Sequence, residues 1–169
     1  MSETVTRYTA RLILLDPESR VLLVRMHNPN VGDADGNVLP EPYWVTVGGA
    51  IDEGERPEDA AMRELYEETG LGPDTTELLH PIWRTEHVLK LYGTLTTLKE
   101  TFFLARTRQT DINPQGLEPS EEDSISELRW WPMKDLLTTT ERIFPSSLRD
   151  EIQRLPADGP PDEIKSILP

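Results

Sequence analysis

Cysteine is absent from the 169-residue sequence, which excludes disulfide bonds and thiolate metal sites. The absence suits a reducing compartment, and we therefore expect a cytoplasmic protein. Long apolar runs are absent as well, and none approaches the length that a membrane-spanning helix needs. Residues 1–4 lack the basic and then apolar stretch of a secretory signal. The sequence therefore predicts no association with a membrane.

Positive charge is scarce, with 17 Lys and Arg residues against 31 Asp and Glu residues and a formal net charge of −14. A chain this acidic repels the phosphates of nucleic acids, so we expect no nucleic-acid partner. A small anionic molecule can still bind where a divalent cation lies between it and the protein. Solubility explains most of the acidity, and the positions of the carboxylates are therefore more informative than their number.

Apolar patterns and turn signals predict a chain of alternating strands and helices. The predicted strands are 7–15, 21–24, 43–47, 83–91, 95–105 and 128–131, and the predicted helices are 57–69, 134–138 and 146–155. The first two strands read as a β-hairpin, residues 27–42 as a long loop, and Ser146 as a helix cap. No repeat or linker divides the chain. We expect one domain over residues 1–155 and a partly mobile C-terminal tail over 156–169.

The predicted helix 57–69 carries the most informative pattern. Glu64, Glu67 and Glu68 are spaced i, i+3 and i+4, so they share an arc of roughly a quarter turn. Like charges at this spacing destabilise an exposed helix by about 0.2–0.5 kcal/mol per pair, and a cation among them would remove that repulsion. Oxygen ligands without cysteine or paired histidine favour Mg²⁺ or Mn²⁺ over zinc. Such an ion supports phosphate chemistry because it neutralises phosphate oxygens and lowers the pKa of a bound water.

Three glutamates alone are more often a solvated helix face, but the residues around them change this interpretation. The stretch 49–71, GAIDEGERPEDAAMRELYEETGL, resembles the Nudix box: Gly, five residues, Glu, seven residues, then Arg-Glu-aliphatic-any-Glu-Glu-any-Gly-aliphatic. Every specified position is filled, and a chance match in a chain of this size is on the order of one in a million. The resemblance implies an α/β/α sandwich with a mixed sheet between helices. It also implies hydrolysis of a phosphoanhydride bond in a nucleoside diphosphate linked to another moiety.

The resemblance assigns roles by position. It makes Glu64, Glu67 and Glu68 metal ligands, one of which also helps to activate water, and it makes Glu55 and Arg63 an ion pair that braces the loop against the helix. Neither the general base nor the number of metal ions follows from the pattern.

Residues outside the box also receive roles from the resemblance. The carbonyl of Gly48 often supplies a further ligand in this family. Many members have proline before the glycine pair, whereas this chain has Val47, which changes the loop shape without removing a ligand. Members commonly use another acidic residue from a later loop, and Glu122 is the candidate here. The alternative for Glu122 is a residue that merely solvates its loop.

The substrate stays open at this point. The proline marker of ADP-ribose hydrolases is absent, since Glu86 and His87 stand at its position, and we find no signature for coenzyme A or NADH hydrolysis. A base could stack on an aromatic side chain, and a cation could touch phosphate; the candidates are Trp83, Tyr92, Trp44, Arg25, Arg84 and Lys99. The favoured interpretation is packing in the core or sheet for these aromatics and relief of surface acidity for these cations.

Two functions remain. The first is a Mg²⁺-dependent hydrolase of a small nucleotide-type molecule. The second is a non-catalytic Nudix-fold sensor of a nucleotide or sugar nucleotide. A homodimer is compatible with both.

Overall fold

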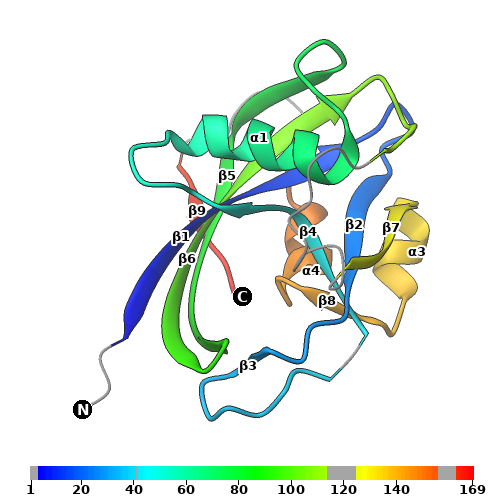
Figure 1. Ribbon diagram of the computed structural model, residues 1–169. Helices are drawn as coiled ribbons and strands as arrows, with labels where there is room; N and C mark the ends of the chain where they lie inside the picture. Colours follow the sequence, from blue (N-terminus) through cyan, green and yellow to red (C-terminus); the bar gives the residue numbers. More distant parts are fainter. Residues whose placement is uncertain (1–3, 41, 114–124, 156–162) are drawn as a thin grey trace.

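The computed structural model describes residues 4–40, 42–113, 125–155 and 163–169. Its elements follow one another along the chain (Figure 1) as β1 (Val5–Leu15), β2 (Val21–Met26), β3 (Val31–Asp33), β4 (Tyr43–Ala50), α1 (Pro57–Thr69), β5 (Thr76–Leu91), β6 (Thr94–Thr107), β7 (Ile125–Trp131), α3 (Met133–Thr138), β8 (Arg142–Phe144), α4 (Leu148–Ile152) and β9 (Lys165–Ser166).

The described strands form one mixed sheet. Its main path runs β3-β5-β6-β1-β2-β4-β8, with β7 paired to β2 and β9 paired to β5. The pairs β1–β6, β4–β8 and β5–β9 are parallel, and the other named pairs are antiparallel. Strand β1 lies at the centre of this sheet, because β6 borders one side along its length and β4 and the start of β2 border the other.

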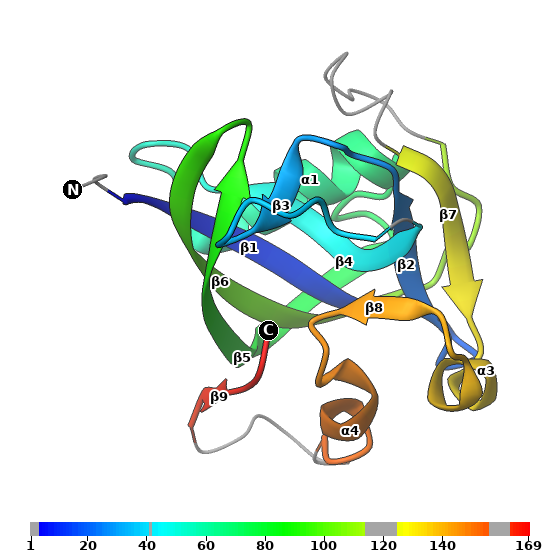
Figure 2. The same ribbon diagram turned by 90° about the horizontal axis from the view of Figure 1, so that it is seen from below.

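Helices cover both faces of the sheet, and the central strand shows why. Leu12 and Leu14 belong to the core cluster beneath α1, whereas Ile13 and Leu15 belong to the cluster that contains the buried residues of α3 and α4. Successive side chains of a strand point to opposite faces, so an unbroken apolar run in β1 requires cover on both. Figures 1 and 2 show α1 and α4 on opposite sides of the sheet. The predicted α/β/α sandwich is confirmed.

Several local predictions need correction. The predicted β-hairpin of residues 7–15 and 21–24 is wrong beyond its turn. Strands β1 and β2 share only the pair Leu15↔Val21, and each then pairs with other strands. The predicted loop 27–42 contains β3, which pairs with β5. Helix α4 is shorter than predicted, and Ser146 does not cap it, since its Oγ donates to the Pro169 carbonyl at 2.5 Å.

The last described segment, 163–169, lies along the sheet. Strand β9 pairs with β5, the backbone N–H of Ile167 donates to the Arg84 carbonyl at 2.9 Å, and Lys165 Nζ is 2.8 Å from Glu151 Oε2. Residues 156–162, the rest of the predicted tail, lie outside the described residues.

Within the described part of the chain, no helix combines the length and the apolar character needed to cross a membrane.

Candidate active site

Two glycines at the end of β4 bring α1 close to the sheet. Gly48 has φ +138°, and a Cβ there would lie 2.2 Å from the Ala10 carbonyl oxygen of β1. A Cβ on Gly49 would lie 2.6 Å from the carboxylate carbon of Glu64 on α1. A side chain at position 48 would collide with the backbone of β1, and a side chain at position 49 would force the carboxylate of Glu64 to move. The glycine pair therefore lets the carboxylate of Glu64 lie directly against the backbone of β4.

Helix α1 begins and ends where local signals place it. Pro57 occupies the first turn together with acidic Glu58 and Asp59, and Gly70 closes the helix in the left-handed conformation at φ 76°. Its buried residues combine apolar side chains with two of the box carboxylates, Glu64 and Glu68. The helix therefore packs on the sheet with part of its acidic stripe turned inward.

The guanidinium of Arg63 links the preceding loop to the helix. Its Nε and Nη2 donate to the two carboxylate oxygens of Glu55, each at 2.9 Å, and Nη2 also donates to the Ala50 carbonyl at 2.9 Å. The hydrogen bond from Arg63 lowers the pKa of Glu55 to about 2. Its Nη1 lies 3.0 Å from Glu64 Oε1 and 3.3 Å from Glu67 Oε2. Its Nη2 also lies 3.6 Å from Asp52 Oδ2, so Arg63 is the counter-ion of four carboxylates at once.

The three glutamates predicted as metal ligands differ in their surroundings. Glu64 and Glu68 are buried, and the side chain of Glu67 is 27% exposed. Glu68 Oε1 accepts a hydrogen bond from the Gly48 N–H at 3.3 Å. Burial raises the pKa of Glu64 above its ordinary value, despite the opposing effect of Arg63. A nearby dication would reverse this effect, because it stabilises the ionised carboxylate.

The chemistry of these donors fits a hard divalent cation, since every one is an oxygen. Among the described residues, however, no three histidine, cysteine, aspartate or glutamate side chains are arranged so that they could hold a metal ion. Arg63 Nη1 donates to both Glu64 and Glu67, so a guanidinium is the positive group beside these two carboxylates. Metal binding would require Glu67 to turn away from Arg63.

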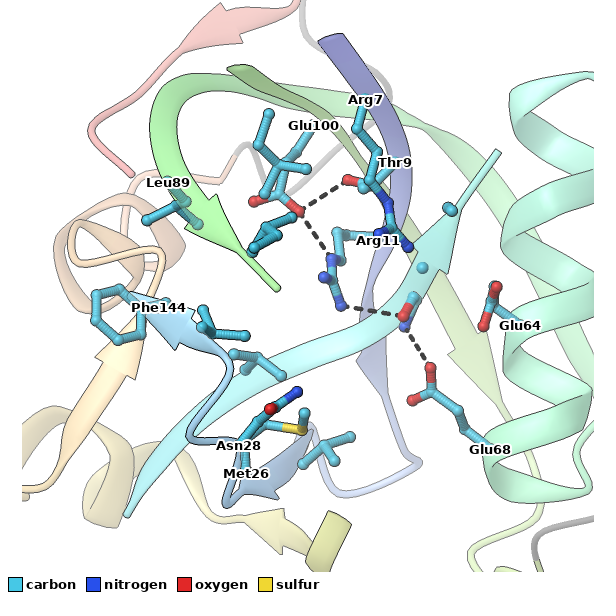
Figure 3. Close-up of a pocket in the computed structure, with 18 of the residues that line it drawn as sticks. Arg7, Thr9, Arg11, Met26, Asn28, Glu64, Glu68, Leu89, Glu100 and Phe144 are labelled. Atoms are coloured by element: carbon cyan, nitrogen blue, oxygen red, sulfur yellow. Dashed lines mark hydrogen bonds and ion pairs between the residues drawn. The ribbon is translucent and has the colours of Figure 1, made fainter. Parts of the chain in front are cut away.

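A cavity of about 550 Å³ opens beside the glycine pair. One wall carries Glu64, Glu67, Glu68 and Arg63 from α1, and the facing wall carries polar residues of β1, β5 and β6 (Figure 3). The end away from α1 is lined mainly by apolar side chains, among them Met26, Leu89 and Phe144. The cavity therefore joins a highly charged half to an apolar half.

Sequence reasoning missed the polar cluster on the facing wall. Glu100 Oε2 accepts hydrogen bonds from Arg11 Nε and Thr9 Oγ1, both at 2.8 Å, and His87 Nε2 lies 3.6 Å from Glu100 Oε1. Burial alone would raise the pKa of Glu100, but the charge of Arg11 and the neighbouring His87 and Thr9 outweigh burial and hold this pKa at about 2. The available signal was the alternation of Arg7, Thr9 and Arg11, which puts three polar residues on one face of a strand.

The other predicted residues fall into three groups. Trp44 and Trp83 are buried in the core cluster on the face opposite α1, which confirms packing as their role and excludes stacking on a base. Tyr92 lines the cavity, whereas Arg25, Arg84 and Lys99 do not. Glu122 lies outside the described residues.

Comparison with known proteins gives three consistent findings. The family model for the NUDIX domain matches residues 5–151. An RNA pyrophosphohydrolase of Thioalkalivibrio sulfidiphilus is 27% identical over 157 residues, which are 81% of this chain and 91% of that protein. The RNA pyrophosphohydrolase of Roseobacter denitrificans is 33% identical over 121 residues, which are 66% of this chain and 69% of that protein.

Solved structures agree on the fold. The MutT protein from Methanosarcina mazei Go1 superposes with a TM-score of 0.63 at 16% identity, covering 91% of this chain and 95% of that one. At this level of identity the likeness concerns the arrangement of elements.

Proposed function

The chain belongs to the NUDIX domain family and is a Nudix hydrolase, and we propose that it is a cytoplasmic, Mg²⁺-dependent enzyme for a small nucleotide-type molecule. Its reaction cleaves a phosphoanhydride bond in a nucleoside diphosphate linked to another moiety. Residues 1–155 act as one catalytic domain. The observation that carries this proposal is the placement of the box carboxylates of α1 on the wall of a large cavity beside the backbone of Gly48.

Four groups would hold the metal in this proposal: the carboxylates of Glu64, Glu67 and Glu68 and the carbonyl of Gly48. When bound, a divalent cation supplies charge neutralisation for the phosphate oxygens and lowers the pKa of a water. The chain's own residues set the geometry. Glu55 and Arg63 fix the loop against α1, and the Gly48 N–H holds Glu68 through its hydrogen bond.

The reaction itself is an attack of water on one phosphorus of the anhydride. The new P–O bond forms as the bridging P–O bond breaks, and the departing phosphate takes the bonding electron pair. One of the cavity carboxylates accepts the proton of the attacking water. The apolar half of the cavity suits the base of a nucleotide, and the charged half suits its phosphates.

The relatives are named RNA pyrophosphohydrolases, which supplies a second candidate substrate, an RNA that carries a pyrophosphate at its end. In its favour, the relative from Thioalkalivibrio sulfidiphilus aligns over 91% of its length. Against it stands the formal net charge of −14, which disfavours a long polyanion. We therefore propose the small molecule first and keep the RNA end as the alternative.

The proposal is tested with a panel of nucleoside triphosphates, dinucleoside polyphosphates, sugar nucleotides and a 5′-triphosphorylated oligoribonucleotide, each assayed with Mg²⁺ and with Mn²⁺. We expect metal-dependent release of a nucleoside monophosphate or a phosphate product. Glu68→Gln should lower this rate by about 10²-fold or more, while Glu77→Gln, an exposed residue of β5, should leave it unchanged. Tight binding of one compound without turnover of any would instead support the sensor function.

A further inference from the structure

The strongest unassigned feature is the polar cluster on the cavity wall that faces α1. We propose that Arg11, oriented by Glu100, is a phosphate-binding residue for the phosphoryl group next to the metal-bound one. This inference rests on the proposed function, since it assigns a second phosphate subsite to the same cavity. Its support comes from how Arg11 is held and from the donors it keeps.

Arg11 is fixed on two sides. Its Nε donates to Glu100 Oε2 at 2.8 Å, and its Nη1 donates to the carbonyls of Thr46 and Gly48 at 3.1 and 3.0 Å. The side chain is only 20% exposed, and that of Glu100 only 11%. A guanidinium held this way loses little further conformational freedom when it binds an anion, because its orientation is already set.

The remaining donors of Arg11 are available for a ligand. Its hydrogen bonds to described residues use Nε and Nη1, and none uses Nη2. Arg11 lines the cavity, and Figure 3 shows its guanidinium between Glu100 and the side of the cavity that carries Glu64 and Glu68. Guanidinium N–H groups match the oxygens of a phosphate in geometry and charge. The Nη2 donors therefore suit a phosphoryl oxygen beside the predicted metal ligands.

The other arginine beside the box glutamates is less suitable for this role. Arg63 is engaged by Glu55, Glu64 and Glu67, so its charge is already shared among carboxylates. Among the described residues, Arg11 forms an ion pair with one carboxylate, that of Glu100, and its Nη1 contacts are neutral carbonyls. A buried ion pair adds little net stability, because desolvation offsets the attraction between its charges. Stability therefore does not explain the Arg11–Glu100 pair, whereas a role in substrate binding does.

Glu100 acts through Arg11 and is a positioning residue. Thr9 Oγ1 donates to the same oxygen, Oε2, and the buried Nε2 of His87 lies near the other oxygen. The register of β1 and β6 places Thr9 directly opposite Glu100, so the two strands build this support together. Replacing Glu100 by Gln should mainly raise KM for the substrate while changing kcat by a few-fold at most, because Arg11 stays present but is less well oriented.

The direct test uses methylenediphosphonate, in which carbon replaces the bridging oxygen so that no hydrolysis occurs. Its affinity is measured by calorimetry in the presence of Mg²⁺. Arg11→Gln should weaken binding on the order of 10–100-fold, the value of one or two charge-assisted hydrogen bonds. Arg11→Lys should recover part of the loss, and Arg106→Gln, an exposed arginine of β6 outside the cavity, should bind like the wild type.

A second variant separates binding from folding. Arg11→Gln alone leaves the carboxylate of Glu100 buried without its partner, which can unfold the protein. The double variant Arg11→Gln/Glu100→Gln removes both charges and should stay folded, as checked by circular dichroism. We expect it to bind the diphosphonate as weakly as the single variant. Wild-type affinity in the folded double variant would overturn the proposal and assign Arg11 a structural role.

The outcomes also distinguish this inference from the proposed function. If the wild type binds the diphosphonate through Arg11 but hydrolyses no compound of the panel, the hydrolase proposal fails and the subsite stands. If the wild type hydrolyses a substrate and Arg11→Gln keeps its KM, the subsite is overturned and the hydrolase stands.

Discussion

At the scale of single residues, the site depends on how closely Gly49 lets Glu64 approach the sheet. We expect Gly49→Ala to lower kcat/KM at least tenfold, because the added Cβ would lie 2.6 Å from the Glu64 carboxylate carbon and must displace it. Overpacking of this kind also lowers the free energy of unfolding by about 1–3 kcal/mol. Steady-state kinetics and urea denaturation measure the two effects separately.

Gly72→Ala is the matched control for that substitution. A Cβ at Gly72 would meet only the Tyr66 ring at 4.0 Å, which is ordinary contact. Its activity should equal that of the wild type. If Gly49→Ala kept full activity, the carboxylate of Glu64 would not need its present position, and its role as a metal ligand would be contradicted.

At the scale of elements, the sequence predicts features that depend on neighbouring residues, such as helix bounds, and does not predict which distant strands pair. The bounds of α1 follow from Pro57 and Gly70, which act within one helical turn, and the structure confirms them. The partner of β1 could not be predicted, because β1 pairs in parallel with β6, about 90 residues away, and no local signal encodes that register. The Arg11–Glu100 pair was missed for the same reason, whereas the glutamates share one helix and were found.

The described C-terminal segment, 163–169, packs on the sheet, and its contribution to the free energy of unfolding can be measured. Ile167 packs against the core cluster on the face of α3 and α4, whereas its neighbour Leu168 is 72% exposed. Ile167→Ala should lower the free energy of unfolding by about 1–2 kcal/mol, less than a fully buried site because Ile167 is only partly buried. Leu168→Ala should change it by less than about 0.5 kcal/mol. Equal effects of the two substitutions in urea denaturation would show that the segment does not dock.

At the scale of the whole molecule, a net charge of −14 means that any salt should stabilise the fold by screening repulsion. A specific divalent site adds a second effect, since a ligand that binds only the folded state stabilises it by about 2.7 kcal/mol at a concentration of 100 times its Kd. We therefore expect MgCl₂ to raise the Tm more than NaCl at the same ionic strength. Glu67→Gln should remove most of this excess, because it deletes the one proposed metal-ligand carboxylate that is not buried and must turn from Arg63 to reach the ion. It should leave the response to NaCl intact, since a single charge changes little of the total repulsion. Identical Tm shifts in the two salts for the wild type would mean that the acidic stripe acts only through its bulk charge, and the metal site would then be wrong.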